Sequence, residues 1–324
     1  MPLPSGHISM YPKELWIKAS LASACLLLIT ILGVACSSGS SQPTKYGTLS
    51  PYGKRPDLAR LNTGPLSADG LQAFLATGDL GVGTNRFSFV LTSSNGIVSV
   101  PQIGISSFKA GDQKSVQSTS ATYSEWPYGT RGSYSTTLQF DQPGNWRVEI
   151  QVANSNGTTG KAELIFDIKD KPDAPNVGAP AVKSVSKTIR DVARLSQLAT
   201  GSLLDPDLYQ KSISEAVTSG APTVVVMASP AFCTNAVCGP QIQVLHDLKD
   251  RYKGKASFIH VDFYDNPEEV QGDLGKARLS PVVLEWNLPS IEWTFVIDKN
   301  GVINARFEGF VTLQEVEEAL KPLL

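Results

Sequence analysis

Residues that bind soft metal ions are scarce in this sequence. Its 324 residues include three histidines, three methionines and four cysteines, and none of these lies between Ser37 and Val226. Copper sites in oxidising compartments need imidazole, thiolate or thioether ligands. That long stretch therefore has no set of ligands for such a site.

Clusters of basic residues are missing as well. No block of lysines and arginines occurs along the chain, and the formal net charge is -2. A protein that binds nucleic acid normally carries a basic patch or stripe, so we expect no nucleic-acid partner. The hydrophobic content of 41% and the charged content of 18% are ordinary for a globular protein. The length predicts two domains.

The first 35 residues have the layout of an export signal. Lys13 and Lys18 precede a largely apolar run over residues 19–35, as a positive region precedes the apolar region of a secretory signal. The run ends in LGVAC at residues 32–36, which resembles the lipobox of bacterial lipoproteins. The resemblance implies that Cys36 becomes the lipid-bearing first residue of the mature protein, held at the bacterial cell membrane and facing the extracytoplasmic side. The alternative is an N-terminal anchor that is not cleaved.

Only two of the four cysteines remain for the exported body of the protein. Cys25 lies in the apolar run and Cys36 is the expected lipid site, which leaves Cys233 and Cys238. An oxidising compartment favours disulfides, and a close pair of cysteines in an exported chain is a candidate disulfide. We therefore expect these two cysteines to be joined at least part of the time.

The region after a flexible tether at residues 36–64 is rich in predicted β-strands. Apolar residues alternate with polar ones, and turn signals separate the runs with no helical period between them. Strands at this spacing predict an antiparallel sandwich. The expected strands cover residues 85–91, 98–105, 132–140, 146–152 and 162–168.

The pattern of these strands also resembles a known family. NRFSFVL followed by GSYSTTLQFDQPGNWRVEIQV is similar to the small bacterial immunoglobulin-like domains of the FixH and YtkA type, and the similarity covers residues 65–169. The resemblance implies an all-β immunoglobulin-like sandwich. Some of those domains accompany copper handling. Because this region has no histidine, cysteine or methionine, we expect a spacer or docking module.

The pattern changes after a proline-rich linker at residues 170–204. Apolar runs and helical periods alternate from there to the C-terminus, which is typical of an α/β domain. We expect a capping box at the last helix, formed by Thr312 and Glu315. The expected helices cover residues 207–219, 240–252 and 312–323, and the expected strands cover residues 222–228, 257–264, 293–298 and 302–307.

The order of these elements resembles the thioredoxin fold, with two cysteines between the first strand and the next helix. The hairpin WTFVIDKNGVI and the loop SPAFCTNAVCGPQ are similar to segments of extracytoplasmic thioredoxin-like lipoproteins that carry a Cys-x4-Cys-Gly-Pro loop. The resemblance implies a central mixed sheet flanked by helices over residues 205–324. It also implies an oxidoreductase that exchanges thiols and disulfides with exported proteins, together with a protein that donates or accepts the electrons.

The chemistry expected of the loop depends on where the helix begins. The free N–H groups and the dipole at a helix N-terminus favour negative charge, and they lower the pKa of a thiol placed there. Gly239 and Pro240 lead into the predicted helix, and proline suits a first helical turn. We therefore expect Cys238, next to the helix, to be the nucleophile. Cys233 would resolve the mixed disulfide.

Three positions depart from the thioredoxin pattern. Phe232 stands where a tryptophan usually precedes the site, and Gln241 replaces the second cysteine. Glu292 occupies the position of the proline whose cis peptide faces the disulfide in that family. Because a cis bond before a residue other than proline costs ~3 kcal/mol or more, we expect this peptide to be trans and the substrate-binding edge to differ.

Three alternative functions remain open at this point. A purely structural disulfide would make the protein a non-catalytic binding or scaffold lipoprotein. Copper handling of the Sco type would use two cysteines and a distant histidine, but neither His246 nor His260 matches that placement. A peroxidase of the peroxiredoxin type would need its cysteine one residue earlier than Cys238.

We expect no metal ion and no cofactor. His260 lies in an alternating strand, where we expect its polar atoms to be satisfied within the sheet. His246 is expected on the outer, solvated side of its helix. Solvated acids at loops and helix starts are also what we expect of the acidic cluster Asp262, Asp265, Glu268 and Glu269.

Overall fold

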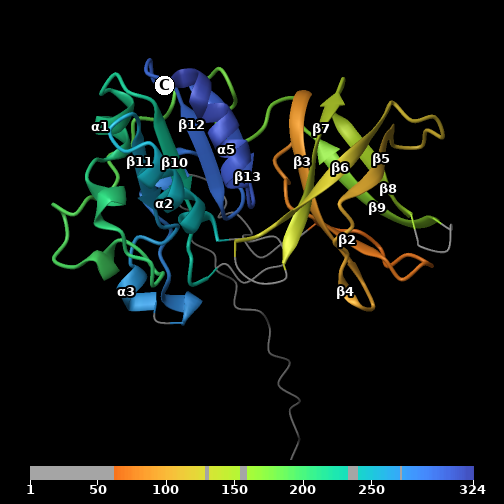
Figure 1. Cartoon of the computed structure of the whole chain (residues 1–324), viewed down its shortest axis with the longest axis horizontal. Helices are drawn as coiled ribbons and strands as arrows, with labels where there is room; N and C mark the ends of the chain where they lie inside the picture. The colour runs from red at the N-terminus through yellow and green to blue at the C-terminus, as the bar shows by residue number, and fades with distance from the viewer. Residues whose placement is uncertain (1–61, 128–130, 154–158, 233–239, 271) are drawn as a thin grey trace, which may run out of the picture. The chain divides into compact units, whose positions relative to one another are not determined.

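In the part of the chain that the structure describes, the strands form two sheets, one of nine strands and one of four (Figure 1). The predicted signal, the lipid site Cys36 and most of the tether lie outside the described residues. Within the described ranges, no helix is both long enough and apolar enough to span a membrane. The computed structural model describes residues 62–127, 131–153, 159–232, 240–270 and 272–324.

The nine-stranded sheet is antiparallel at every pairing. Its neighbouring strands follow the order β1-β2-β3-β7-β6-β5-β8-β9, and β4 pairs with the end of β3. The strands are β1 Asn62–Thr63, β2 Gln72–Leu75, β3 Gly83–Ser93, β4 Gly96–Ile97, β5 Gln102–Lys109, β6 Gln117–Glu125, β7 Gly132–Phe140, β8 Gly144–Ala153 and β9 Thr159–Ile168.

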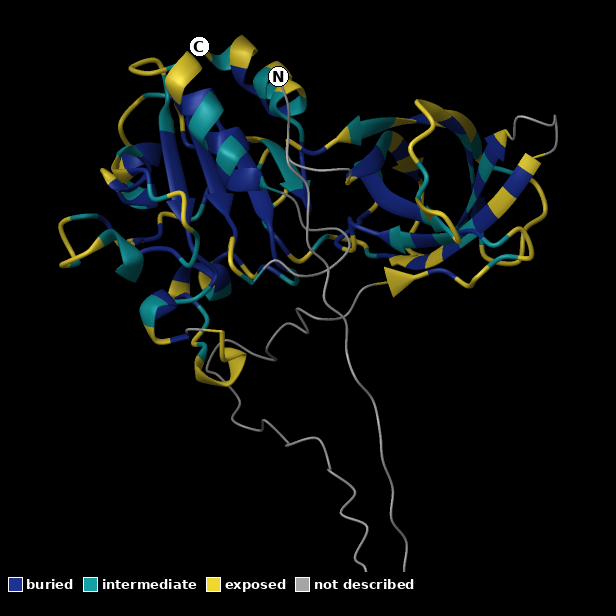
Figure 2. Cartoon of the chain, turned by 60° about the horizontal axis from the view of Figure 1, so that its bottom comes forward, coloured by how far each residue is buried: buried dark blue, intermediate teal, exposed yellow. Residues whose placement is uncertain are grey.

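Alternation along the strands decides which face of this sheet is buried. In β9, Leu164 and Phe166 are buried, whereas Ile165 between them is exposed. Successive side chains of a strand point to opposite faces of the sheet, so one face carries a continuous apolar core (Figure 2). Trp146 lies in this core and packs edge-on against Phe140, with the ring centres 5.0 Å apart.

The fold class expected from the sequence is wrong. We expected an immunoglobulin-like sandwich followed by an α/β thioredoxin-like domain with a central mixed sheet flanked by helices. The structure is mostly β, with 37% strand and 19% helix, and its main feature is one large antiparallel sheet that comes close to forming a barrel.

The strand β6 explains why a sandwich was expected. It pairs with β7 on one side and with β5 on the other, and so joins what would otherwise be two sheets. Its sequence, QSTSATYSE, buries only Ala121, so it lacks the apolar alternation by which strands are recognised.

The strand expected at residues 132–140 is confirmed as β7. Alternation does not say which strand pairs with which.

The two ends of the large sheet approach each other. The side chain of Asn62, in β1, donates a hydrogen bond from Nδ2 to the carbonyl oxygen of Ile165 at 3.1 Å. Gly64 is buried, and a Cβ atom built on it would lie 2.0 Å from the carbonyl oxygen of Glu163. Only a glycine therefore allows the chain after β1 to come this close to β9.

The four-stranded sheet has the order β11-β10-β12-β13. β10 is parallel to β11 and antiparallel to β12, and β12 is antiparallel to β13. Every residue of β10 and β12 is buried, as expected of central strands covered on both faces. The strands are β10 Thr223–Met227, β11 Ser257–Val261, β12 Trp293–Ile297 and β13 Ile303–Glu308.

Helices contribute to both cores beside this sheet. Val224 and Val226 of β10 belong to the core that includes side chains of α2 and α5, whereas Val225 and Met227 belong to the core that includes side chains of α1 and α4. Successive side chains of β10 therefore pack alternately into these two cores. The helices are α1 Ile213–Val217, α2 Gln241–Arg251, α3 Pro267–Val270, α4 Pro281–Glu285 and α5 Leu313–Leu320.

Capping residues set the starts of the helices. Thr312 caps α5 and forms the expected capping box with Glu315, which confirms that prediction. The helix expected over residues 207–219 is interrupted. A 3₁₀ turn at Pro206–Tyr209 comes first, and Ser212 then caps α1 as a separate helix.

The close approach of β9 gives a direct test of the large sheet. In Gly64→Ala the new Cβ meets a backbone oxygen at 2.0 Å, so the backbone has to move. We expect the free energy of unfolding to fall by about 1–3 kcal/mol, the usual cost of overpacking, as measured by urea denaturation.

Gly104→Ala in β5 is the matched control for this test. The nearest atom to its new Cβ would be 3.5 Å away, and we expect the free energy of unfolding to change by less than about 1 kcal/mol. Equal losses in the two variants would show that β9 does not come this close to residue 64.

Candidate functional site

The predicted cysteine loop connects the end of β10 to the start of α2. β10 ends at Met227 and α2 begins at Gln241, with Pro240 in the N-cap position. Cys233, Cys238 and Gly239 lie outside the described residues, so their pairing and their roles stay predictions. The described residues on either side of this gap hold the two ends of the loop.

The first end of the loop is tied to a buried carboxylate. Thr200 donates hydrogen bonds to Oδ2 of Asp262 from its backbone nitrogen at 2.8 Å and from its hydroxyl at 2.9 Å. The Thr200 hydroxyl donates its proton to Asp262, so its oxygen can only accept further hydrogen bonds. It accepts one from the Ser229 hydroxyl at 3.0 Å and one from the Ala231 N–H at 3.3 Å. Asp262 therefore positions residues 229–231 through Thr200.

Asp262 itself is not the solvated acid that we expected. The chain around Thr200 covers it, and burial raises the pKa of its carboxyl. The neighbouring His260 and the hydrogen bonds from Thr200 and from the Tyr264 N–H act in the opposite direction, but they are the smaller effects. Phe232 packs its ring edge-on against Tyr264, with the ring centres 5.7 Å apart.

His260 is a buried histidine with both ring nitrogens hydrogen-bonded. Burial lowers its pKa, which favours the neutral ring. Its Nε2 lies 3.0 Å from the carbonyl oxygen of Ala228 and must carry the proton, and its Nδ1 accepts a hydrogen bond from the Tyr209 hydroxyl at 2.6 Å. This confirms the expectation that its polar atoms are satisfied within the fold. A metal ion would have to displace one of these hydrogen bonds.

His246 is not free in solvent, which corrects the expectation for it. Its Nδ1 lies 2.7 Å from Oδ2 of Asp205, and the Lys249 Nζ lies 2.6 Å from the same oxygen. No group of three or more histidine, cysteine, aspartate or glutamate side chains is arranged to hold a metal ion in the part of the chain that is described. The remaining members of the acidic cluster form ion pairs: Asp265 with Lys187, Glu268 with Arg194 and Glu269 with Arg278.

Gln241 holds the second end of the loop. The sequence led us to expect Gln241 in place of a second cysteine, and in the structure its side chain is 1% exposed. Its Oε1 accepts a hydrogen bond from the backbone N–H of Val311 at 3.0 Å, which ties the start of α2 to the segment before α5. Its Nε2 is buried and has no hydrogen-bond partner among the described residues.

Glu292 lies at the entry to β12, and its backbone has an unusual conformation. Its φ is 75°, in the left-handed region that a residue with a side chain rarely adopts. No peptide bond among the described residues is cis, which confirms the expected trans peptide here. The carbonyl oxygen of Glu292 accepts a hydrogen bond from the Gly309 N–H at 2.9 Å. Asn287, with φ 49°, lies in the same region, which asparagine tolerates, so the backbone strain of the segment at residues 287–292 lies at Glu292.

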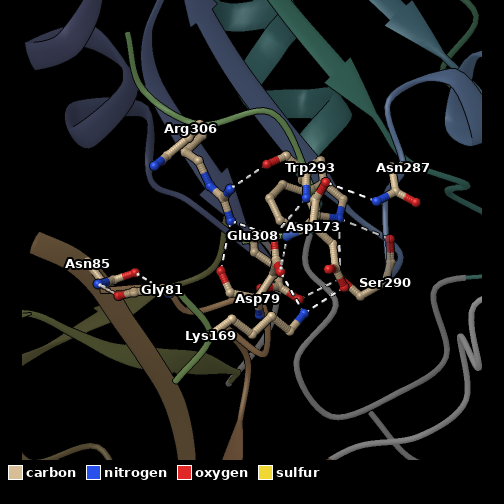
Figure 3. Close-up of polar contacts among 12 residues, drawn as sticks. Asp79, Gly81, Asn85, Lys169, Asp173, Asn287, Ser290, Trp293, Arg306 and Glu308 are labelled. Carbon is tan, nitrogen blue, oxygen red and sulfur yellow. Dashed lines mark hydrogen bonds and ion pairs between the residues drawn. The ribbon is translucent and has the colours of Figure 1, made fainter. Parts of the chain in front are cut away.

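A second polar centre, shown in Figure 3, lies where the two sheets meet. Asp79, in the connection between β2 and β3, has no exposed side-chain surface. Its carboxylate accepts hydrogen bonds from Arg306 of β13 at 2.8 Å and from Lys169 at 2.9 Å. The backbone N–H groups of Asp173 and Ala174 donate to it at 2.8 and 3.0 Å.

These contacts decide the charge of Asp79. Burial alone would raise the pKa of this carboxyl, but the charge of Arg306 and the hydrogen bonds from Lys169 and the backbone lower it below the ordinary value. Arg306 also donates to the carbonyl oxygen of Ala174 at 2.9 Å. We call this set, Asp79, Lys169, Asp173, Arg306 and Glu308, the ionic junction.

Glu308 is the least compensated member of the ionic junction. Its Oε2 accepts a hydrogen bond from the backbone N–H of Asp79 at 2.7 Å, and its Oε1 accepts one from the Ser290 hydroxyl at 2.5 Å. Burial raises its pKa to about 7, against an ordinary value of 4.5. The sequence held no sign of this junction, because Asp79 and Glu308 are 229 positions apart.

The ionic junction predicts a large effect from one substitution. Asp79→Asn leaves Arg306 and Lys169 without a buried negative partner, and removing one partner of a buried ion pair costs about 3–5 kcal/mol. We expect a loss of that size in the free energy of unfolding, measured by urea denaturation at neutral pH.

The control is the same substitution at an exposed ion pair. Asp141 pairs with Lys109 at 2.9 Å, and its side chain is 57% exposed. Asp141→Asn should cost less than about 1 kcal/mol. If Asp79→Asn costs no more than this control, the junction does not hold the sheets together.

Comparisons with known proteins leave the function to be argued from these residues. A scan against protein-family models, a search of curated proteins and a search of solved structures found no match to the chain. The two features on which a function can be built are therefore the ends of the cysteine loop and the ionic junction.

Proposed function

We propose that this chain is a membrane-anchored thiol–disulfide oxidoreductase that acts outside the cytoplasm through Cys233 and Cys238. The observation that carries the proposal is the position of this pair in the chain. Both cysteines fall between the end of β10, a fully buried central strand, and the start of α2. They are also the only cysteines that remain after the predicted signal and the lipid site.

The electrostatics at the start of α2 support a reactive thiolate. α2 has 11 residues and no acidic side chain in its first turn, so the positive end of its dipole is not offset there. A thiol near such an end has a lowered pKa, and the thiolate is the attacking species. Gln241 adds a buried amide donor, and a hydrogen bond from such a donor to a thiolate favours the charged form.

The exchange follows from two thiolate attacks. The Cys238 sulfur attacks a disulfide of an exported protein, and that bond breaks as a mixed disulfide forms and one substrate thiolate leaves. Cys233 then attacks the Cys238 sulfur, which releases the second substrate thiolate and closes the Cys233–Cys238 disulfide. The substrate gains two electrons and this chain loses two. The reverse sequence oxidises a dithiol substrate.

A separate redox protein has to restore the starting state. Reduction outside the cytoplasm needs electrons from across the membrane, whereas oxidation needs an electron acceptor. The predicted signal and the lipid on Cys36 would keep the chain at the membrane, close to such a partner. The attachment is testable by itself, because the mature protein should carry a mass consistent with diacylglycerol on Cys36.

Trapping tests the proposed roles of the two cysteines. In the full chain, Cys233→Ser leaves the nucleophile without its resolving partner, so mixed disulfides with exported proteins should accumulate. Cys238→Ser and the double variant should trap none. The measurement is non-reducing electrophoresis of membranes after acid quenching, with each mixed disulfide confirmed by its loss on reduction.

A structural disulfide gives the opposite results. It would have a reduction potential below about -300 mV, which resists the glutathione pool, and Cys233→Ser would trap nothing. That pair of outcomes would make the protein a binding or scaffold lipoprotein and would end the proposal.

A further inference from the structure

Glu308, at the end of β13, is hydrogen-bonded to two other segments, one of them 229 positions away in the sequence. Its carboxyl accepts hydrogen bonds from the Asp79 N–H, in the connection between β2 and β3, and from the Ser290 hydroxyl, in the strained segment before β12. Glu308 is the last residue of β13 and lies opposite Trp293 of β12. One carboxyl therefore connects the two sheets and borders the segment at residues 287–292 (Figure 3).

We propose that Glu308 is a proton-operated latch, whose neutral carboxyl closes the contact between the two sheets and whose ionised carboxyl loosens it. The proposal is independent of the cysteine chemistry and concerns only the ionic junction and the segment beside it.

The charges around Glu308 are already balanced without it. Arg306 and Lys169 offset Asp79 and Asp173 within the junction. An ionised Glu308 is therefore a surplus negative charge in a buried place, which is costly unless the group is neutralised or reaches water. Burial is also the main reason that its pKa is raised to about 7.

The neighbouring cations among the described residues compensate Glu308 only in part, since the charge of Arg306 lowers its pKa by less than burial raises it. Arg86, from β3, is paired with Glu315 of α5 at 2.7 Å. Ionisation of Glu308 is therefore opposed chiefly by burial, which outweighs the hydrogen bonds from Ser290 and the Asp79 N–H and the charge of Arg306.

Space for the ionised form exists beside the carboxyl. A cavity of about 180 Å³ is lined by Glu308, Asp79, Arg86, Arg306 and Asn304 together with neighbouring residues. A polar cavity of this size can hold several waters. Ionisation would therefore draw the carboxyl toward water and away from the Asp79 N–H.

Ionisation of Glu308 would also affect β12, because Ser290 contacts both Glu308 and Trp293. The Ser290 hydroxyl donates to Glu308, and the indole Nε1 of Trp293 lies 3.2 Å from the same hydroxyl oxygen and 3.0 Å from the Ser290 carbonyl oxygen. A change in the protonation of Glu308 should therefore alter the chemical shift of the Trp293 indole N–H.

The sign of the pH effect follows from linkage. The folded pKa of Glu308 lies near 7 and the ordinary value is 4.5, so the folded state binds this proton more tightly than the unfolded state does. The stability from this group is fully present below the unfolded pKa and is lost as the pH rises through the folded one. Asp79 has a lowered pKa, so its contribution is lost at acid pH instead and does not overlap this window.

The test is a titration of the ¹⁵N-labelled full chain by nuclear magnetic resonance, with the Trp293 indole signal assigned by its loss in Trp293→Phe. We expect this signal to shift with a midpoint near pH 7, and we expect no such shift in Glu308→Gln. We also expect the ratio of folded to unfolded protein to fall on the order of 100-fold between about pH 5 and about pH 8 in the unchanged chain, relative to Glu308→Gln.

Matched variants separate the latch from other groups. Glu318→Gln makes the same substitution at an exposed position of α5 and should leave the Trp293 titration unchanged. The chain with Cys233→Ser and Cys238→Ser should also titrate as before. A Trp293 signal that does not move over this pH range, or that moves equally in Glu308→Gln, would overturn the proposal.

A further measurement keeps the test decisive if Glu308→Gln does not fold. The side-chain carboxyl carbon of Glu308 can be followed directly in the ¹³C-labelled, unchanged chain. A midpoint near 7 supports the latch, whereas a midpoint close to the ordinary 4.5 contradicts it.

Discussion

A carboxylate without solvent exposure connects the two sheets of this protein. Asp79, between β2 and β3, receives hydrogen bonds from Arg306 of β13 and from the backbone that leads out of β9. Separating these groups would leave a buried charge without a partner, which is strongly destabilising. The contact therefore fixes how β13 and the β2–β3 connection lie together. Glu308 and the strained segment before β12 border the same contact, so they depend on it.

Local features of the fold could be predicted from the sequence. The strand at residues 132–140, the apolar run at residues 222–228 and the cap at Thr312 depend on neighbours close along the chain. β6 was missed because serine and threonine occupy much of it, and without β6 the large sheet resembled two sheets of a sandwich. The fold class was wrong because strand pairing is a long-range property that alternation does not encode.

The candidate site also has some features that the sequence predicts and others that it does not. The spacing of Cys233 and Cys238 and the start of α2 are visible in the sequence, whereas the supports of the loop are not. Asp262 resembled a solvated acid, yet it holds residues 229–231 through Thr200. Gln241 resembled a lost cysteine, yet its side chain ties α2 to the chain before α5. Segments that are distant in the sequence bury both residues, and this burial changes the role of each.

A double-mutant cycle on Asp79→Asn and Arg306→Gln tests the central claim most directly, with the free energy of unfolding measured in urea for all four chains. Residues in one buried network show interaction energies of about 0.5–3 kcal/mol, whereas independent sites add within about 0.5 kcal/mol. The structure predicts a coupling of at least about 1.5 kcal/mol between these two residues. Additive losses would contradict the claim that this ion pair connects the two sheets.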